Sequence, residues 1–365
     1  MNQAKTREIF DQFVHYGSYV LAVPYGTGHI NDTMQVVCDQ GGVMLHYILQ
    51  RLNHHIFPQP DKLMENIVRV TEHIGAKIKA SGMTGRKRTI ELLKAKADGK
   101  PYVRDGEDWY RAYVFIENAR TYDILETADQ AYQAAKAFGA FQCDLADLPA
   151  PRLNETIVDF HNTPKRLATL EQAAKEDKCG RLKDVQPEMD FVLARKGEVS
   201  RLIDMSAQGL FPERITHNDT KLNNVLIDDL SGNGLAVIDL DTTMPGLVHY
   251  DFGDMVRTGT SPAAEDETDL SKVTMRFPMF EALLRGYIES AKGFLTPAER
   301  EELPFSGKLI TLEIGIRFLT DYLQGDVYFK IHREKHNLDR CRTQFKLVAS
   351  IEQQFEQMQK LLKTL

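Results

Sequence analysis

The sequence predicts a two-lobed α+β fold, with a small β-rich N-terminal lobe and a larger helical C-terminal lobe. Up to Asn118, short apolar runs rich in β-branched residues alternate with turn signals. Beyond Asn118, apolar residues recur at helical spacing, and one predicted β-hairpin interrupts the helices. The chain has 365 residues, which is enough for two lobes around a large core. We expect the lobes to span residues 1–118 and 119–365.

The N-terminal lobe is expected to combine five strands with one helix. In the helical segment, apolar residues such as Leu63, Ile67 and Ile74 recur three to four positions apart. The last strand segment is expected to turn through Arg104–Asp108. The predicted segments are, in chain order, the strands Tyr19–Val23, Thr33–Cys38 and Met44–Arg51, the helix Asp61–Lys79, and the strands Thr89–Lys96 and Tyr102–Ile116.

The C-terminal lobe is expected to be helical around one β-hairpin. Several of its helical segments carry a proline near their start, where the missing N–H is tolerated. The hairpin is predicted from Val225–Ile227 and Leu235–Leu240, which flank the Gly-containing turn Ser231–Gly234. The predicted helices are Ala128–Asp144, Pro164–Asp177, Pro187–Met205, Met275–Lys292, Pro297–Leu323 and Gln344–Leu362.

Composition narrows the class of protein. The chain is 42% hydrophobic and 27% charged, which is ordinary for a globular enzyme, and its net charge of −7 argues against nucleic-acid binding. No run of 18 apolar residues and no N-terminal apolar core occurs, so we expect no membrane span and no signal peptide. The four cysteines are far apart, which indicates reduced thiols rather than a zinc site or disulfides. These features predict a cytoplasmic enzyme that acts on small molecules.

The densest polar constellation frames the predicted hairpin. It reads HNDTKLNN at His217–Asn224, and after the hairpin IDLD ends at Asp241. Phosphoryl transfer requires a carboxylate to orient and deprotonate the acceptor, oxygen ligands for Mg²⁺, and positive charge near the moving phosphoryl group. Asp219 would be the base, Asn224 and Asp239 the metal ligands, and Lys221 the charge. The alternative is a polar turn whose side chains only cap local backbone.

The pattern H-x-D-x-K-x-x-N resembles the catalytic loop of kinases, where the Asn five residues after the Asp binds metal. The string DFG at Asp251–Gly253 imitates the metal motif of protein kinases, but it follows a Pro-Gly break. We therefore interpret Asp251 as a helix N-cap or a brace for the loop, and Asp239 as the metal ligand. Asp241 remains an alternative ligand.

The N-terminal lobe should hold the nucleotide. Gly26 and Gly28 lie in a loop between two predicted strands, where kinases cover the phosphates, although such a loop can also be an ordinary hairpin turn. The third strand should present a cation to the phosphates, yet Gln50 occupies that position and Arg51 should face the other way. In kinases a glutamate on the following helix pairs with this cation, and the sequence leaves open whether Glu65, Glu72 or neither residue takes that role.

The end of the last predicted strand, around Ile116, is where the hinge should bind adenine through backbone groups. The alternative is a buried strand leading into a loop.

Nearly the whole chain resembles the N-acetylhexosamine 1-kinase group within the aminoglycoside-phosphotransferase superfamily. The shared strings are YGTGHIN from Tyr25, HNDTKLNN from His217, IDLDT and MPG from Ile238, DFGD from Asp251, LPFSG from Leu303, RFLTDY from Arg317 and GDVYF from Gly325. The resemblance implies an ATP- and Mg²⁺-dependent enzyme that phosphorylates the anomeric hydroxyl of N-acetylglucosamine or N-acetylgalactosamine. It places Asp219 at O1, and His29, Arg317 and Tyr328 at the sugar.

Alternatives remain for these sugar contacts. Arg317 has Glu313 and Asp321 four residues to either side, so a structural ion pair is also possible, while His29 could be a loop residue and Tyr328 a core aromatic. Among the positions expected to line the sugar pocket, Ala22 and Thr258 stand where bulkier apolar residues are expected, which leaves the preference for the C2 substituent open.

Two other functions compete with this one. A kinase of the same fold could act on another sugar, an amino alcohol or an aminoglycoside. A cationic acceptor, such as an amino alcohol or an aminoglycoside, calls for an aromatic or acidic cage. The only tryptophan, Trp109, lies in the wrong lobe to form one, and the acidic loop Glu265–Asp269 is typical of a solvated surface. The other alternative is an inactive nucleotide- or sugar-binding module, which only Gln50 favours.

Overall fold

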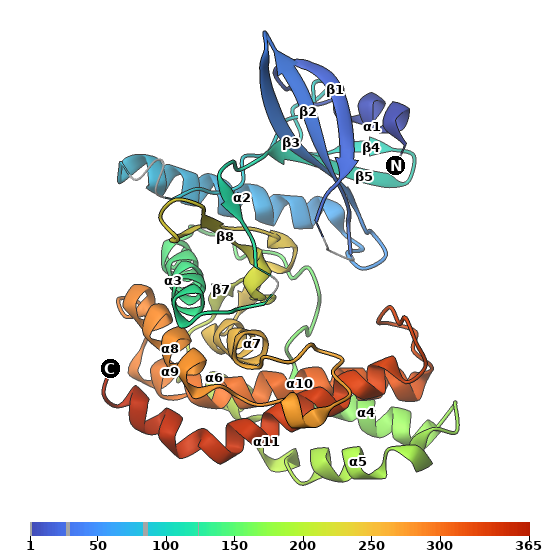
Figure 1. The fold of residues 1–365 in the computed structure, drawn as a ribbon, viewed down its shortest axis with the longest axis vertical. Coiled ribbons are helices and arrows are strands. Elements are labelled where there is room, and N and C mark those ends of the chain that lie inside the picture. The colour runs from blue at the N-terminus through green and yellow to red at the C-terminus, as the bar shows by residue number, and fades with distance from the viewer. Residues whose placement is uncertain (1, 27–29, 83–86, 123) are drawn as a thin grey trace.

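The computed structural model describes residues 2–26, 30–82, 87–122 and 124–365. It confirms the predicted fold class, because a β-rich N-terminal lobe stands on a larger helical C-terminal lobe (Figure 1). Among the described residues, no helix is both long and apolar enough to cross a membrane.

The N-terminal lobe is built on a five-stranded antiparallel sheet in the order β1-β2-β3-β5-β4. One face packs on a small helix, α1 (Gln3–Phe10), whose Ile9 and Phe10 are fully buried against the sheet. The strands are β1 (Ser18–Pro24), β2 (Asp32–Gln40), β3 (Val43–Leu52), β4 (Val103–Asp105) and β5 (Asp108–Val114).

The strand predicted at Thr89–Lys96 does not form. Leu92 makes an isolated bridge with Tyr113, and the backbone N–H of Leu93 donates to the carbonyl of Ala112. The reason is that β5 offers a single free edge beyond β3. Strand β4 takes the first half of that edge, so only a short stretch is left for residues 91–93.

Helix α2 (Pro60–Ala80) ties the two lobes together. Its apolar stripe, including Leu63, Ile67 and Ile74, is buried in one cluster with residues of the helical lobe rather than with the sheet. Pro60 occupies its first turn, where the missing N–H costs little. The sheet is thereby held over one end of the helical lobe (Figure 1).

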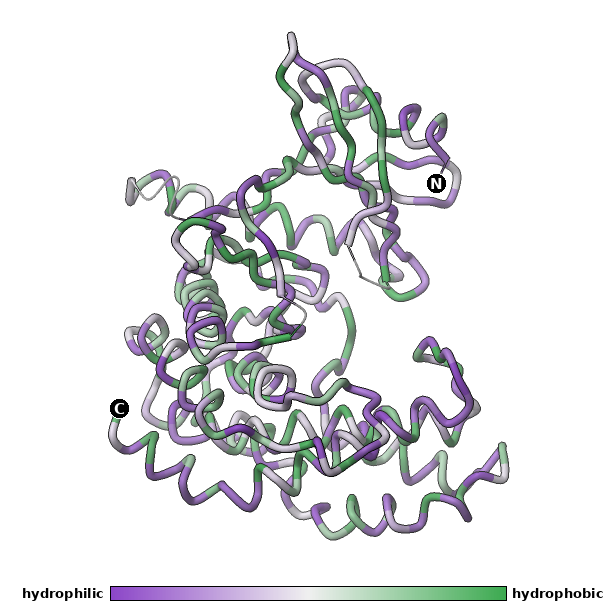
Figure 2. Tube along the Cα trace, in the orientation of Figure 1, coloured by the Kyte–Doolittle hydropathy of each residue, from purple (hydrophilic) through white to green (hydrophobic). Residues whose placement is uncertain are grey.

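The C-terminal lobe surrounds α10 (Leu303–Gln324), which is buried along almost its whole length. Figure 2 shows the outer helix α11 (His336–Leu362) alternating between hydrophilic and hydrophobic residues, as expected for a surface helix with one apolar face. The other helices are α3 (Ala128–Leu145), α4 (Thr163–Glu176), α5 (Gln186–Leu193), α6 (Arg201–Ala207), α7 (Val248–Thr260), α8 (Phe277–Ala291) and α9 (Pro297–Glu301).

Three predicted helices differ in extent. The segment Pro187–Met205 is divided into α5 and α6, with Gly197 between them in a short 3₁₀ turn. The segment Pro297–Leu323 breaks at Glu302, because Pro304 lacks an N–H and occupies the first turn of a new helix. Helix α11 begins at His336, eight residues before the predicted Gln344, and it ends at Leu362, as predicted.

The predicted hairpin forms inside the helical lobe. Strand β8 (Val225–Asp228) pairs with β9 (Gly234–Val237), and β6 (Ala119–Arg120) adds to its edge. A second small ladder joins β7 (Arg214–Thr216) to β10 (Met244–Gly246). The two ladders hold the loops at 217–224 and 238–243 side by side, at the face of the helical lobe nearest the sheet.

Candidate active site

The 217–224 loop leaves β7 and ends in a 3₁₀ turn, Leu222–Asn224, that leads into β8. Asn218 has a φ of 64°, in the left-handed region that Asn tolerates better than most residues. Its side chain donates to the carbonyl of Thr242 (2.9 Å), and His217 Nε2 lies 2.9 Å from the carbonyl oxygen of Ile238. The loop is therefore fixed to the segment that follows the hairpin.

Asp251 braces this loop from the first turn of α7. Its carboxylate accepts hydrogen bonds from the backbone N–H groups of His217 (2.9 Å) and Asn218 (2.7 Å) and from Gln142 Nε2 (2.6 Å). The side chain is fully buried, and Leu247 rather than Asp251 occupies the N-cap. Of the two interpretations of Asp251, the brace is confirmed and the N-cap is wrong.

Asp219 is half-buried at the surface of the loop. Lys221 Nζ lies 3.4 Å from its Oδ1, and Asn224 Nδ2 donates to its backbone carbonyl (2.8 Å). Burial would raise the pKa of Asp219, but the positive charges of Lys221, His217 and Arg257 lower it overall. The structure thus brings three predicted site residues together in one loop, with Lys221 and Asn224 both against Asp219.

Asp239 follows β9 with a φ of 58°, again in the left-handed region. It is exposed, and no described residue donates a hydrogen bond to its carboxylate. The pKa of Asp239 is raised, first because the surrounding protein reduces its solvation and then because Asp241 and Asp219 add negative charge. A carboxylate in this setting attracts a cation.

These residues fit a magnesium ion that arrives with a nucleotide. Asn224 uses its Nδ2 toward Asp219, which leaves its amide oxygen available, and Asp239 has both carboxylate oxygens available. Within the described ranges, no group of three or more His, Cys, Asp or Glu side chains could hold a metal on its own. Mg²⁺ needs no such cage, since phosphates and water complete its shell in nucleotide-dependent enzymes.

Asp241 does not have the open carboxylate that a metal ligand needs. Its Oδ1 forms an ion pair with Arg111 Nη1, and its Oδ2 accepts from Asn31 Nδ2 (2.6 Å). Arg111 on β5 stands opposite Gln50 on β3 and donates through Nε to the Gln50 amide oxygen (2.8 Å). The sequence interpretation did not single out Arg111, although its position on the sheet face shared with Gln50 could have indicated it.

The structure describes only some of the residues predicted to bind the nucleotide. Gly26 has a φ of 79° and open space around it, while Gly28 and His29 lie outside the described residues. Arg51 points away from Gln50, as expected, and pairs with Asp32. At Ile116 the chain has left β5, and no backbone hydrogen bond within the described residues uses its N–H or carbonyl, so both groups are available to an adenine edge.

Arg317 lies among aromatic rings and makes no ion pair with any residue that the structure describes. Its guanidinium carbon stands 5.1 Å from the ring centre of Phe160, 5.8 Å from that of Tyr328 and 5.5 Å from that of Phe329. Glu313 instead binds His161 Nδ1 (2.8 Å) and Thr163 Oγ1 (2.6 Å). The ion-pair interpretation is therefore wrong among the described residues.

Asp321, the other proposed partner of Arg317, is also engaged elsewhere. It accepts hydrogen bonds from the backbone N–H groups of Val327, Tyr328 and Phe329, at 2.9, 2.8 and 2.9 Å. Asp321 thereby fixes the segment that carries Tyr328. Tyr328 itself is 58% exposed, so it is not a core aromatic.

His161 connects this aromatic cluster to the 217–224 loop. Its Nε2 lies 3.2 Å from the carbonyl oxygen of Asn218, the residue before Asp219, and its ring lies against that of Phe160 (4.7 Å between centres). Contacts from Arg317 to the Phe160 ring, and from that ring to His161, thus connect Arg317 with the loop that carries Asp219.

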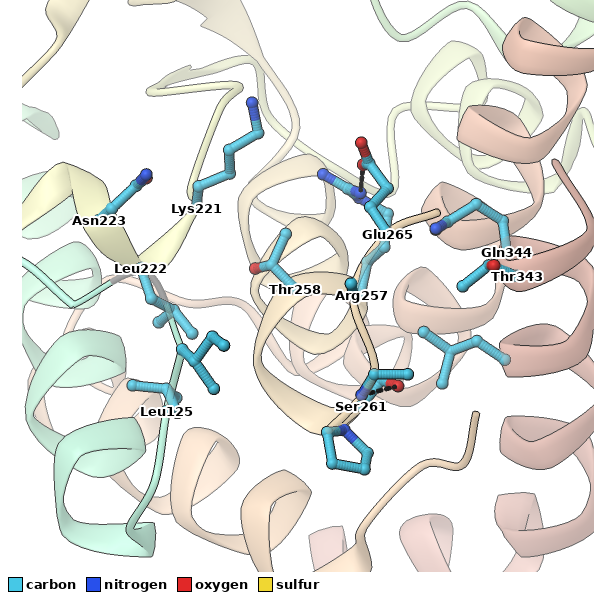
Figure 3. A pocket seen from close by; sticks show the side chains of 15 residues that line it. Leu125, Lys221, Leu222, Asn223, Arg257, Thr258, Ser261, Glu265, Thr343 and Gln344 are labelled. Carbon is cyan, nitrogen blue, oxygen red and sulfur yellow. Dashed lines mark hydrogen bonds and ion pairs between the residues drawn. The ribbon is translucent and has the colours of Figure 1, made fainter. Parts of the chain in front are cut away.

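A pocket of about 250 Å³ opens on another side of the loop (Figure 3). Lys221 and Leu222 line one side, Thr343 and Gln344 of α11 the other, and the Arg257–Glu265 ion pair (2.8 Å) lies between them. Thr258, predicted to replace a bulkier residue, belongs to this lining.

Two expectations about the pocket region need correction. Ala22 is fully buried in the core of the N-terminal sheet, so it is not open to a sugar as expected. The acidic loop Glu265–Asp269 is not simply solvated, because Glu265 pairs with Arg257 and Asp266 with Arg333 and His336. Two of its carboxylates are therefore paired with basic side chains of α7 and of the start of α11 and the residues just before it.

The two-lobed fold and the Asp-x-Lys-x-x-Asn loop define the class of kinase-like phosphotransferases. Residues 22–272 match the phosphotransferase enzyme family, and the chain belongs to that family.

Solved structures share this fold over nearly the whole chain. An aminoglycoside phosphotransferase from Alicyclobacillus acidocaldarius is 11% identical (TM-score 0.64), with 98% of this chain and 96% of that chain covered. A microcompartment-associated aminopropanol kinase is 15% identical (TM-score 0.56), with 98% of each chain covered. A spectinomycin phosphotransferase in complex with ADP and spectinomycin is 13% identical (TM-score 0.56), with 98% of this chain and 99% of that chain covered. At these identities the likeness shows the fold alone.

Proposed function

We propose that the protein transfers the γ-phosphate of ATP to the anomeric hydroxyl of an N-acetylhexosamine, either N-acetylglucosamine or N-acetylgalactosamine. The observation that carries the proposal is the position of Asp219 between Lys221 and Asn224, with Asp239 presented by the adjoining hairpin, in a chain of the phosphotransferase family. The choice of acceptor is supported by the motif resemblance and by Arg317, which has no ion-pair partner among the described residues.

In this reaction the sugar O1 attacks the γ-phosphorus, the bond from that phosphorus to the β–γ bridging oxygen breaks, and the proton of O1 passes to Asp219. The lowered pKa of Asp219 keeps its carboxylate ionised at neutral pH, ready to accept this proton. An anomeric hydroxyl is more acidic than an ordinary alcohol, which suits a base of low pKa. Lys221 lies beside Asp219, where its charge offsets that of the moving phosphoryl group.

Magnesium bound with ATP would neutralise phosphate charge, and Asn224 and Asp239 are the residues that would hold it. Adenine would be bound by the backbone groups at Ile116, which have no backbone partner among the described residues. These two roles assign the nucleotide to the space between the sheet and the helical lobe.

The surroundings of Arg317 favour an uncharged acceptor over a cationic one. An ammonium group is recognised by the faces of aromatic rings or by carboxylates. Here the guanidinium of Arg317 already lies over Phe160, Tyr328 and Phe329, and it would repel a second cation. Sugar hydroxyls and an acetamido oxygen, in contrast, accept the hydrogen bonds that Arg317 can donate.

Release of ADP with a panel of acceptors tests this proposal. The purified protein is incubated with MgATP alone and with N-acetylglucosamine, N-acetylgalactosamine, glucose, ethanolamine, choline or kanamycin. The account predicts stimulation by the two N-acetylhexosamines and none by the amines. Stimulation by an amine would replace the proposed acceptor with the alternative, a kinase of another small alcohol. ATP binding without turnover of any acceptor would favour the inactive module.

A further inference from the structure

The third strand, β3, has no cation to offer to a nucleotide. Kinases place a lysine there against the α- and β-phosphates. In this chain, both ends of the Gln50 side chain are used within the sheet: its amide nitrogen donates to Thr33 Oγ1 (2.9 Å) and its amide oxygen accepts from Arg111 Nε (2.8 Å). Arg51 lies on the opposite face, where its Nε donates to Asp32 (3.0 Å).

Arg111 is a cation on the inner face of the same sheet. It lies on β5 directly across from Gln50, and only 4% of the residue is exposed. Its Nε binds Gln50 and its Nη1 binds Asp241, while its Nη2 has no hydrogen-bond partner among the described residues. A buried guanidinium is costly unless its donors are satisfied, so the two N–H groups of Nη2 remain for a further acceptor.

The position of Arg111 coincides with the expected place of the triphosphate. Asp241 follows the predicted metal ligand Asp239 by two residues. Asp241 also accepts from Asn31 (2.6 Å), which ends the loop that begins at Gly26.

We propose that Arg111 replaces the missing third-strand cation and binds the α- and β-phosphates of ATP through Nη2, and that Asp241 holds Arg111 in place rather than binding metal. This inference rests on the ATP-dependent part of the proposed function, not on the identity of the sugar. In other kinases, a glutamate on a helix positions the β3 lysine at the phosphates. In this chain, Asp241 of the segment after the hairpin would position Arg111 of β5 in the same way. It also explains why neither Glu65 nor Glu72 is needed as a partner.

The competing account is that the ion pair only ties the sheet to the helical lobe. Two variants separate the accounts. Arg111→Met removes the cation but leaves Asp241 as an unpaired buried carboxylate, which should lower Tm. The double variant Arg111→Met/Asp241→Asn removes both charges, which should recover part of that loss. Arg51→Met is the matched control, because it removes a neighbouring exposed arginine from the other face of the sheet.

Calorimetric titration of each variant with ATP, ADP and adenosine, with Mg²⁺ and with EDTA, gives the decisive Kd values. We expect the double variant to bind ATP and ADP about 10- to 100-fold more weakly than the wild type, as for the loss of one charge-assisted hydrogen bond, with or without Mg²⁺. Adenosine binding should not change, and Arg51→Met should match the wild type throughout.

Three results would overturn the inference. Wild-type affinity of the double variant for ATP would make Arg111 a purely structural tie. A loss seen only with Mg²⁺ would assign the effect to the metal site instead. If the wild-type protein bound no adenine nucleotide at all, the proposed function would fail and the inference with it, an outcome distinct from normal nucleotide binding by the variants.

Discussion

Replacing Asp251 with asparagine should weaken the fold and the reaction without removing the need for magnesium. The carboxylate accepts three hydrogen bonds from buried groups: the N–H of His217, the N–H of Asn218 and the side-chain amide of Gln142. An asparagine keeps one oxygen and turns an NH₂ group toward at least one of these donors. Losing one bond to a charged acceptor and leaving one donor unsatisfied corresponds to about 2–4 kcal/mol.

Urea unfolding at pH 7.5 measures this free energy, and Asp190→Asn on the exposed surface of α5 is the control. The change should also displace Asp219, which follows the two braced N–H groups, and lower kcat by up to about 100-fold. Titration of activity with Mg²⁺ should still show dependence on the metal, whereas Asp239→Asn should abolish turnover and weaken Mg²⁺-dependent nucleotide binding. If Asp251→Asn were fully stable, or if it and not Asp239→Asn removed the metal dependence, the assignment of these two acids would be refuted.

Three further predictions concern single residues. Asp219→Asn should lower kcat by about 100-fold or more while the Kd for ATP is preserved; a variant with full kcat would exclude Asp219 as the base. Arg317→Met should raise the KM for the sugar and lower kcat/KM about 10- to 100-fold without changing the KM for ATP, and an equal effect on both substrates would contradict a sugar contact. Burial lowers the pKa of His249 to about 4, so its unfolded form takes up a proton first as the pH falls from 6.5 toward 4. The free energy of unfolding should therefore decrease by about 1.4 kcal/mol per pH unit in that range, and His249→Gln should remove that part of the slope in urea titrations at several pH values.

The local parts of the site could be predicted from the sequence because they depend on spacing. Asp219, Lys221 and Asn224 belong to one loop, and the hairpin that carries Asp239 has a turn signal between two apolar runs. The Pro-Gly break before Asp251 indicated a brace, and the hydrogen bonds that its carboxylate accepts confirm that role. All of these sequence features involve residues close together in the chain.

Arg111 could be identified only from the pairing of the strands and not from a local motif, because its role depends on contacts distant in sequence. It meets Gln50 only through the pairing of β3 with β5, and Asp241 only through the packing of the two lobes. The same reason explains why the ion pair considered as an alternative for Arg317 does not form among the described residues. Glu313 is at the right helical spacing for an ion pair, but His161 and Thr163 take its carboxylate from another part of the chain.

The identity of the phosphorylated oxygen tests the central claim most directly. The protein is incubated with MgATP and N-acetylglucosamine or N-acetylgalactosamine, and phosphorus–proton coupling is recorded in the product. The account predicts coupling of phosphorus to the anomeric proton, as in a sugar 1-phosphate without a free reducing end. Coupling only to the methylene protons at C6, or no phosphorylated product from either sugar, would contradict it.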